Sequence, residues 1–184
     1  MADLARTASA ETAVSALDAA LRLVAVRGRH YDIAAADALR ERARVIAGRG
    51  AYGRARARRA LAFADGLAQL PGESISRLYI ARLGFASPRL QVPVAARGEN
   101  RFYYVDFGLD DVDAFGEFDG KDKYADPEFL RGRTPQQALA DEKEREDWIR
   151  GTSRRVVARW TSSHISSSDE LGRRLRAFGI VPPG

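Results

Sequence analysis

The sequence contains no cysteine and only two histidines, His30 and His164, among its 184 residues. Without cysteine the chain can form no disulfide, no thiolate metal site and no cysteine nucleophile. Two histidines are too few for a zinc site built on several imidazoles. These absences exclude disulfide frameworks, the common zinc sites and cysteine catalysis.

Long apolar runs are also missing. No stretch approaches the roughly 18 consecutive apolar residues of a membrane-spanning helix. The first residues, Met-Ala-Asp-Leu-Ala-Arg, lack the charged-then-apolar pattern of a signal peptide. We therefore expect a cytoplasmic protein with no membrane partner.

Lysine is scarce, because 27 of the 30 basic residues are arginine, and the charge is unevenly distributed. Residues 1–70 hold 12 arginines and 7 acids, a net of +5, whereas residues 71–184 hold 18 of each sign. Within the second part, residues 106–128 contain 9 acids and 2 lysines, a net of −7. Such a deficit favours a bound cation or a basic partner, as in a metal-dependent enzyme that acts on a polyanion. The alternative is a solvated acidic loop.

Hydrophobic periodicity divides the chain at Pro71-Gly72. Residues 1–70 are predicted to be all helix, with helices over Glu11–Val26, Ile33–Ile46 and Gly53–Leu67. Residues 71–184 predict helix, three strands, helix, strand, helix, which implies a mixed sheet flanked by helices. The fold class is therefore α/β, preceded by an all-α N-terminal segment. The elements expected after residue 70 are Glu73–Leu83, Leu90–Val94, Arg101–Phe107, Ala114–Asp119, Pro135–Arg150, Arg155–Trp160 and Asp169–Phe178.

Three carboxylates on neighbouring strands form the candidate site. Asp106 lies near the end of one strand, and a tight hairpin would place it beside Glu117 on the next. Glu117 and Asp119 are two residues apart, so both project from the same face of their strand. Apolar residues surround all three, and half-buried carboxylates are costly unless they are paired or metal-bound. The pattern predicts that Asp106, Glu117 and Asp119 bind Mg²⁺ or Mn²⁺. Acids turned to solvent on a hairpin are the alternative.

Two lysines and a further glutamate complete the candidate site. Lys121 or Lys123 follows the carboxylates and could position an attacking water or neutralise charge that develops on phosphorus. Glu73 begins the helix after Pro71-Gly72. In the alternative interpretation the Glu73 carboxylate interacts favourably with the positive end of the helix dipole, or it pairs with Arg77, four residues further on.

These motifs resemble the PD-(D/E)xK nuclease superfamily. The pattern consists of Asp106 in Val-Asp-Phe, then Glu117-Phe-Asp-Gly, then Lys-Asp-Lys-Tyr. It is most similar to the small bacterial domains grouped with very-short-patch-repair endonucleases, and it covers roughly residues 71–178. The resemblance implies a restriction-endonuclease-like fold, a Mg²⁺ or Mn²⁺ cofactor and a catalytic set of Glu73, Asp106, Glu117, Asp119 and one lysine.

The chain departs from the superfamily pattern at one position. The superfamily's lysine falls two residues after Glu117, where this chain has Asp119. Many members of the branch share that Asp and have a histidine a few residues later, where Lys123 stands here, with Lys121 as a second candidate. The helices of residues 1–70 resemble the segment that follows a winged helix like that of abortive-infection antitoxins.

Several arginines are candidate contacts to nucleic acid. Arg54, Arg56, Arg58 and Arg59 surround one predicted helix as a basic collar, and Arg145 and Arg150 lie on the helix behind the site. A solvated helix face is the alternative for the collar, and Arg145 has acidic neighbours with which it could pair. We expect a metal-dependent nuclease that hydrolyses phosphodiester bonds of DNA. The rival is a non-catalytic nucleic-acid- or protein-binding module on the same scaffold, an antitoxin-like regulator that acts with a protein partner or as a homodimer.

Overall fold

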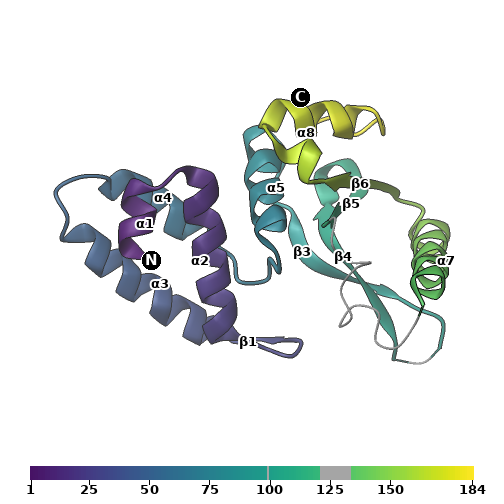
Figure 1. Cartoon of the computed structure of the whole chain (residues 1–184), viewed down its shortest axis with the longest axis horizontal. Coiled ribbons are helices and arrows are strands. Elements are labelled where there is room, and N and C mark those ends of the chain that lie inside the picture. Colours follow the sequence, from purple (N-terminus) through teal and green to yellow (C-terminus); the bar gives the residue numbers. More distant parts are fainter. Residues whose placement is uncertain (99, 121–133) are drawn as a thin grey trace. The chain divides into compact units, whose positions relative to one another are not determined.

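The computed structural model describes residues 1–98, 100–120 and 134–184. These residues form two compact units, Met1–Leu78 (unit 1) and Tyr79–Gly184 (unit 2), with the boundary inside helix α5 (Figure 1). The elements in chain order, with 3₁₀ helices written η, are α1 (Ala2–Thr7), α2 (Ala10–Ala25), β1 (Val26–Arg27), β2 (His30–Tyr31), α3 (Ile33–Gly48), α4 (Arg54–Phe63), α5 (Pro71–Arg82), β3 (Arg89–Ala95), β4 (Phe102–Leu109), η1 (Asp110–Val112), β5 (Ala114–Asp119), α7 (Pro135–Ser153), β6 (Val156–Thr161), η2 (Ser162–Ile165) and α8 (Ser168–Arg176).

Unit 1 is helical, as its sequence predicts. Helices α2 and α3 begin at capping side chains, because Ser9 accepts a hydrogen bond from the Thr12 amide and Asp32 accepts one from the Ala35 amide. Two features were not predicted: helix α1 is too short to show a periodic apolar stripe, and the β1–β2 hairpin has only two residues on each side. Gly28 turns this hairpin with a φ of 60°, a conformation that glycine adopts without strain.

The core of unit 1 is built mainly of alanine and leucine. Leu17 and Leu21 of α2 are fully buried, and alanines from α1, α3 and α4 pack around them. Small side chains let the helices approach closely and lose little conformational entropy on burial. The apolar stripe read from the sequence of α2 is therefore the face that meets the other helices.

A buried ion pair lies inside this apolar unit. Nη2 of Arg77 contacts both carboxylate oxygens of Asp18, at 3.0 and 2.8 Å, and its Nη1 donates to the Phe63 carbonyl at 2.6 Å. The side chains of Asp18 and Arg77 are 1% and 4% exposed. Burial raises the pKa of Asp18 against the opposing effect of Arg77. Arg77 thus pairs with Asp18 of α2, a residue that sequence patterns did not single out.

Unit 2 contains a four-stranded mixed sheet in the order β3-β4-β5-β6. Strands β3, β4 and β5 pair antiparallel, and β5 pairs with β6 parallel. Helix α7 lies between β5 and β6 in the chain and begins at Thr134, whose hydroxyl accepts from the Gln137 amide at 3.2 Å. The predicted order of three antiparallel strands, a helix and a returning strand is confirmed.

The two faces of this sheet carry different apolar clusters. Val105 and Phe115 belong to a buried cluster that includes Ile149 of α7. On the other face Phe107 stacks on Trp160 with 5.3 Å between ring centroids. Gly116 lies under Trp160 so closely that a Cβ would come within 2.3 Å of the indole. Figure 1 shows α7 and α8 at different sides of the sheet.

Within the described ranges, no helix combines the length and the apolar composition that a membrane crossing requires.

Candidate functional site

The pairing of β4 with β5 ends next to two of the predicted carboxylates. The pair at that end is Phe107 with Gly116, and the next residues along the two strands are Asp106 and Glu117. Asp106 and Glu117 therefore follow the same pair on adjacent strands. That their carboxylates converge on one metal ion stays a prediction.

Asp106 is bonded to the sheet itself. Its Oδ2 accepts a hydrogen bond from the Phe118 amide of β5 at 2.8 Å, and its Oδ1 lies 3.4 Å from Nε2 of Gln91. Gln91 has a φ of 49°, which is rare for a residue other than glycine. Val105 and Phe107 flank Asp106 but belong to clusters on opposite faces of the sheet, so the alternation of the strand breaks here. Asp106 therefore stabilises a local irregularity in β4.

Glu117 lies between two guanidinium groups. Nη2 of Arg145, on α7, lies 2.6 Å from Oε1, and Nε and Nη2 of Arg159, on β6, lie 2.8 and 2.7 Å from Oε2. The Glu117 residue is only 7% exposed. Burial raises the pKa of Glu117, but the charges of Arg145 and Arg159 outweigh it and hold that pKa below its usual value. Both oxygens of the expected metal ligand are thus engaged by the chain's own arginines.

The two arginines are held in turn by acids of α7. Arg145 also contacts Glu142 and donates to the Tyr104 carbonyl at 2.6 Å, and Arg159 contacts both Glu142 and Glu146. Burial lowers the pKa of Arg159, but its carboxylate neighbours outweigh this and raise the pKa above its ordinary range. Three acids alternate with the guanidinium groups and tie α7 to the sheet. We call Glu117, Glu142, Arg145, Glu146 and Arg159 the α7 ion network.

Arginines also neutralise the turn between β4 and β5. Asp110 contacts Arg89 and Arg155, and Asp113 contacts Nε of Arg155 at 2.8 Å. Hydrogen bonds from Arg89 and Arg155 hold the pKa of Asp110 far below its usual value. Two acids of this turn, Asp110 and Asp113, therefore meet basic partners from β3 and from the residue before β6. The alternative of a solvated acidic loop does not describe the buried Glu117, whereas Asp110 and Asp113 are exposed to solvent as well as paired.

The remaining predicted site residues are more scattered. Asp119 ends β5 opposite Thr161 of β6, and Lys121 and Lys123 lie outside the described residues. Glu73 belongs to unit 1, where it is buried and its Oε2 accepts from the Gln69 amide at 2.8 Å. In the ranges 1–98, 100–120 and 134–184, no three Asp, Glu or His side chains gather closely enough to hold a metal ion.

The arginines of the predicted collar all lie on the exposed surface of α4 but point to different places. Nε of Arg54 donates to the Gly50 carbonyl at 2.7 Å. Nη1 of Arg56 donates to the Thr7 and Ala8 carbonyls at the end of α1. Arg58 faces a groove between α3 and α4. Arg54 and Arg56 thus donate hydrogen bonds to backbone carbonyls as well as carrying charge, whereas Arg58 is exposed to solvent beside the groove.

Comparison with known proteins gives two relatives, both from Mycobacterium tuberculosis. The chain is 32% identical over 133 residues to the uncharacterized protein MT2308 of strain CDC 1551 and to the uncharacterized protein Rv2248 of strain H37Rv. Each match covers 72% of this chain and 45% of the relative, so the chain spans about half the length of the curated relatives it matches. No protein-family model and no solved structure matches the chain.

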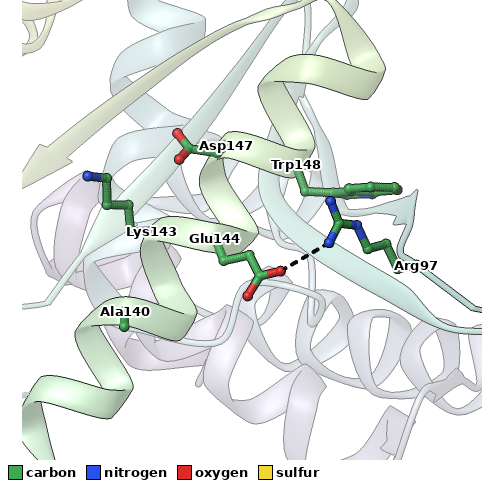
Figure 2. A pocket seen from close by; sticks show the side chains of 6 residues that line it. All are labelled: Arg97, Ala140, Lys143, Glu144, Asp147 and Trp148. Carbon is green, nitrogen blue, oxygen red and sulfur yellow. Dashed lines mark hydrogen bonds and ion pairs between the residues drawn. The ribbon is translucent and has the colours of Figure 1, made fainter.

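The outer face of α7 carries a second group of side chains that the sequence did not reveal. Trp148 is partly exposed, and its indole N–H donates to the Ala95 carbonyl at 2.8 Å. Figure 2 shows the guanidinium of Arg97 at the face of the Trp148 ring while it reaches Glu144, and its Cζ lies 4.7 Å from the ring centroid. The contact fixes the end of the β3–β4 hairpin on α7. The other tryptophan, Trp160, is buried in the core.

Arg150 and Arg159 show what spacing along a helix or strand can and cannot reveal. Arg150, a predicted phosphate contact, bonds Glu146 at 2.7 Å through an i,i+4 pair that the sequence could have predicted. The partners of Arg159 lie on β5 and α7, far away in sequence, so no local pattern pointed to them.

Proposed function

We propose that this chain binds nucleic acid without cutting it, and that unit 2 uses a restriction-endonuclease-like fold as a non-catalytic scaffold. The observation that carries the proposal is the engagement of both Glu117 oxygens by Arg145 and Arg159. The resemblance to nucleases supports the fold, whereas the site contacts support a structural role for its central glutamate. A fold alone does not determine chemistry.

The residues do not fit a magnesium site built on Glu117. Mg²⁺ requires oxygen ligands at about 2.0–2.1 Å in nearly octahedral geometry. A divalent cation at that distance from Glu117 would stand beside two guanidinium charges that are themselves half-buried. Displacing Arg145 and Arg159 would leave them without their main carboxylate partner, which is costly for buried charges. Glu117 therefore has its compensating charge without a metal ion.

The exposed arginines of unit 1 supply the proposed contact to nucleic acid. Residues 1–70 carry a net charge of +5, and four arginines lie on the ten residues of α4. Arginine donates to phosphate in bidentate geometry, and contacts of this kind dominate affinity that is independent of sequence. Binding is expected to weaken steeply as salt concentration rises.

The test is a binding and cleavage panel on the full chain. Labelled single-stranded and duplex DNA and RNA are mixed with the protein in EDTA, Mg²⁺ or Mn²⁺ and followed by gel shift and by denaturing gel. The proposal predicts shifted, intact nucleic acid in every condition, and loss of the shift when Arg54, Arg56, Arg58 and Arg59 are all changed to Gln. Absence of any shift at low salt would refute it.

The second candidate is the metal-dependent nuclease. It is favoured by Asp106 and Glu117 following the Phe107–Gly116 pair on adjacent strands, with Asp119 at the end of β5. Cleavage in Mn²⁺ that Asp106→Asn and Glu117→Gln both abolish would establish this function and overturn the first. Asp106→Asn is the decisive variant, because its amide oxygen can still accept from the Phe118 amide and preserve the sheet.

A further inference from the structure

A groove between α3 and α4 has the composition of a phosphate-binding site. It has a volume of about 370 Å³ and lies within unit 1. Leu61, which is buried, and Ala62 form its apolar part, and charged side chains surround it. The groove-lining charges are Arg40, Arg44 and Arg58 with Asp37 and Glu41, which leaves one positive charge in excess.

Two of the three arginines are already matched by neighbours on α3. Arg40 contacts Asp37 at 2.7 Å, and its Nη2 donates to the Ala64 carbonyl at 2.9 Å, so it also joins α3 to the end of α4. Arg44 contacts both oxygens of Glu41 at 2.7 Å. These pairs orient the two guanidinium groups along the side of the groove.

Arg58 supplies the charge that is not matched. It lies on the exposed side of α4, and within the part of the chain that the structure describes its guanidinium has no hydrogen-bond or ion-pair partner. The Arg44–Glu41 pair is open to solvent, with side chains 63% and 58% exposed, and such pairs contribute little to stability. Arg44 can therefore turn toward an anion at small cost and join Arg58.

We propose that this groove holds a backbone phosphate of the nucleic acid, bound between Arg58 and Arg44 with the sugar against Leu61 and Ala62. The inference rests on the proposed function and deepens it by placing the contact on one side of α4. An apolar surface beside two guanidinium groups matches a nucleotide unit, in which an anion adjoins a less polar sugar. Because no base edge is read, the contact carries no sequence preference.

The experiment measures the affinity of the full chain for a short labelled duplex by fluorescence anisotropy across a salt series. Arg58→Ala is expected to weaken binding by about three- to tenfold at low salt and to lower the slope of log Kd against log salt concentration by about one, as loss of one phosphate contact does. Glu41→Gln removes a competing carboxylate beside the groove and is expected to tighten binding.

Arg42→Ala is the matched control. Arg42 is an exposed arginine of α3 outside the groove-lining set, and its removal changes the net charge by the same amount as Arg58→Ala. It is expected to leave the salt slope unchanged. If wild-type protein binds the duplex but Arg58→Ala and Arg42→Ala behave alike, the groove is wrong and the proposed function stands. If wild type binds no nucleic acid at low salt, both proposals fail.

Discussion

Arg159 places two nitrogens against one oxygen of Glu117: Nε donates to Oε2 at 2.8 Å, and Nη2 lies 2.7 Å from the same oxygen in an ion pair. The two residues lie opposite each other on the parallel strands β5 and β6. Glu117 is central in the sequence motif. In the folded chain it lies on β5 and accepts from arginines of β6 and α7, so it connects these elements to β5. Glu117 is therefore a buried member of the α7 ion network.

Glu117→Gln is expected to destabilise unit 2 by about 3–5 kcal/mol, because removing one partner of a buried ion pair leaves the other charges uncompensated. Both tryptophans of the chain lie in unit 2, so urea unfolding followed by their fluorescence reports on this unit. Glu144→Gln, an exposed change on the same helix, is the control and should cost less than about 0.5 kcal/mol. Equal stability of the two variants would mean that the network contributes nothing.

The contribution of Glu117 should depend on pH in a defined direction. The pKa of Glu117 in the folded chain lies below the ordinary value of 4.5, so its contribution is present above that value and is lost as the pH falls through the lowered pKa. The stability gap between wild type and Glu117→Gln should be constant near neutral pH and close in acid below about pH 4.5. Chemical unfolding at a series of pH values measures it. A gap that widens in acid would contradict the assigned sign.

Two substitutions test whether Asp106 serves as a hydrogen-bond acceptor for β5. Asp106→Asn keeps an oxygen for the Phe118 amide and should cost less than about 1 kcal/mol, whereas Asp106→Ala leaves that amide unsatisfied and should cost about 1–3 kcal/mol. Thermal or urea unfolding of both variants gives the comparison. If the two cost the same, the hydrogen bond to β5 is not what Asp106 supplies.

The Asp18–Arg77 pair should behave as a coupled unit. Either Asp18→Leu or Arg77→Met alone is expected to destabilise unit 1 by about 3–5 kcal/mol, while the double variant should recover much of the loss, since an apolar pair can replace a buried ion pair. Far-UV circular dichroism follows the melting of this helical unit, and a double-mutant cycle gives the interaction energy. Additive losses would show that the two charges are energetically independent.

Manganese should leave the stability of the protein unchanged. A site occupied at 100 times its Kd would add about 2.7 kcal/mol, which shifts the Tm by several degrees. With Glu117 engaged by two arginines, equal Tm values are expected in Mn²⁺ and in EDTA by differential scanning fluorimetry. A rise in Tm that disappears in Asp106→Asn would instead identify a metal site at β4.

Local patterns in the sequence were enough to predict most of the elements. The apolar stripe of α2, the Thr134 cap of α7 and the alternation in β3 are all set by neighbouring residues, so each can be recognised from a short stretch of sequence. The antiparallel pairing of β4 with β5 could also be predicted, because a short connection between two strands permits few registers. Helix α1 and the β1–β2 hairpin were missed because they are too short for a period to develop.

What the sequence determined by itself was the order of the helices and strands, the acidic excess around residues 106–128 and the basic excess before residue 71. Only the tertiary structure decided where those charges find partners, as Asp18 does in Arg77 and Glu117 does in Arg145 and Arg159. The physical reason is distance along the chain: a charge pattern states how much compensation is needed, but the compensating group is chosen by which elements pack together. The partners of Glu117 are Arg145, from a helix 28 residues away, and Arg159, from a strand 42 residues away.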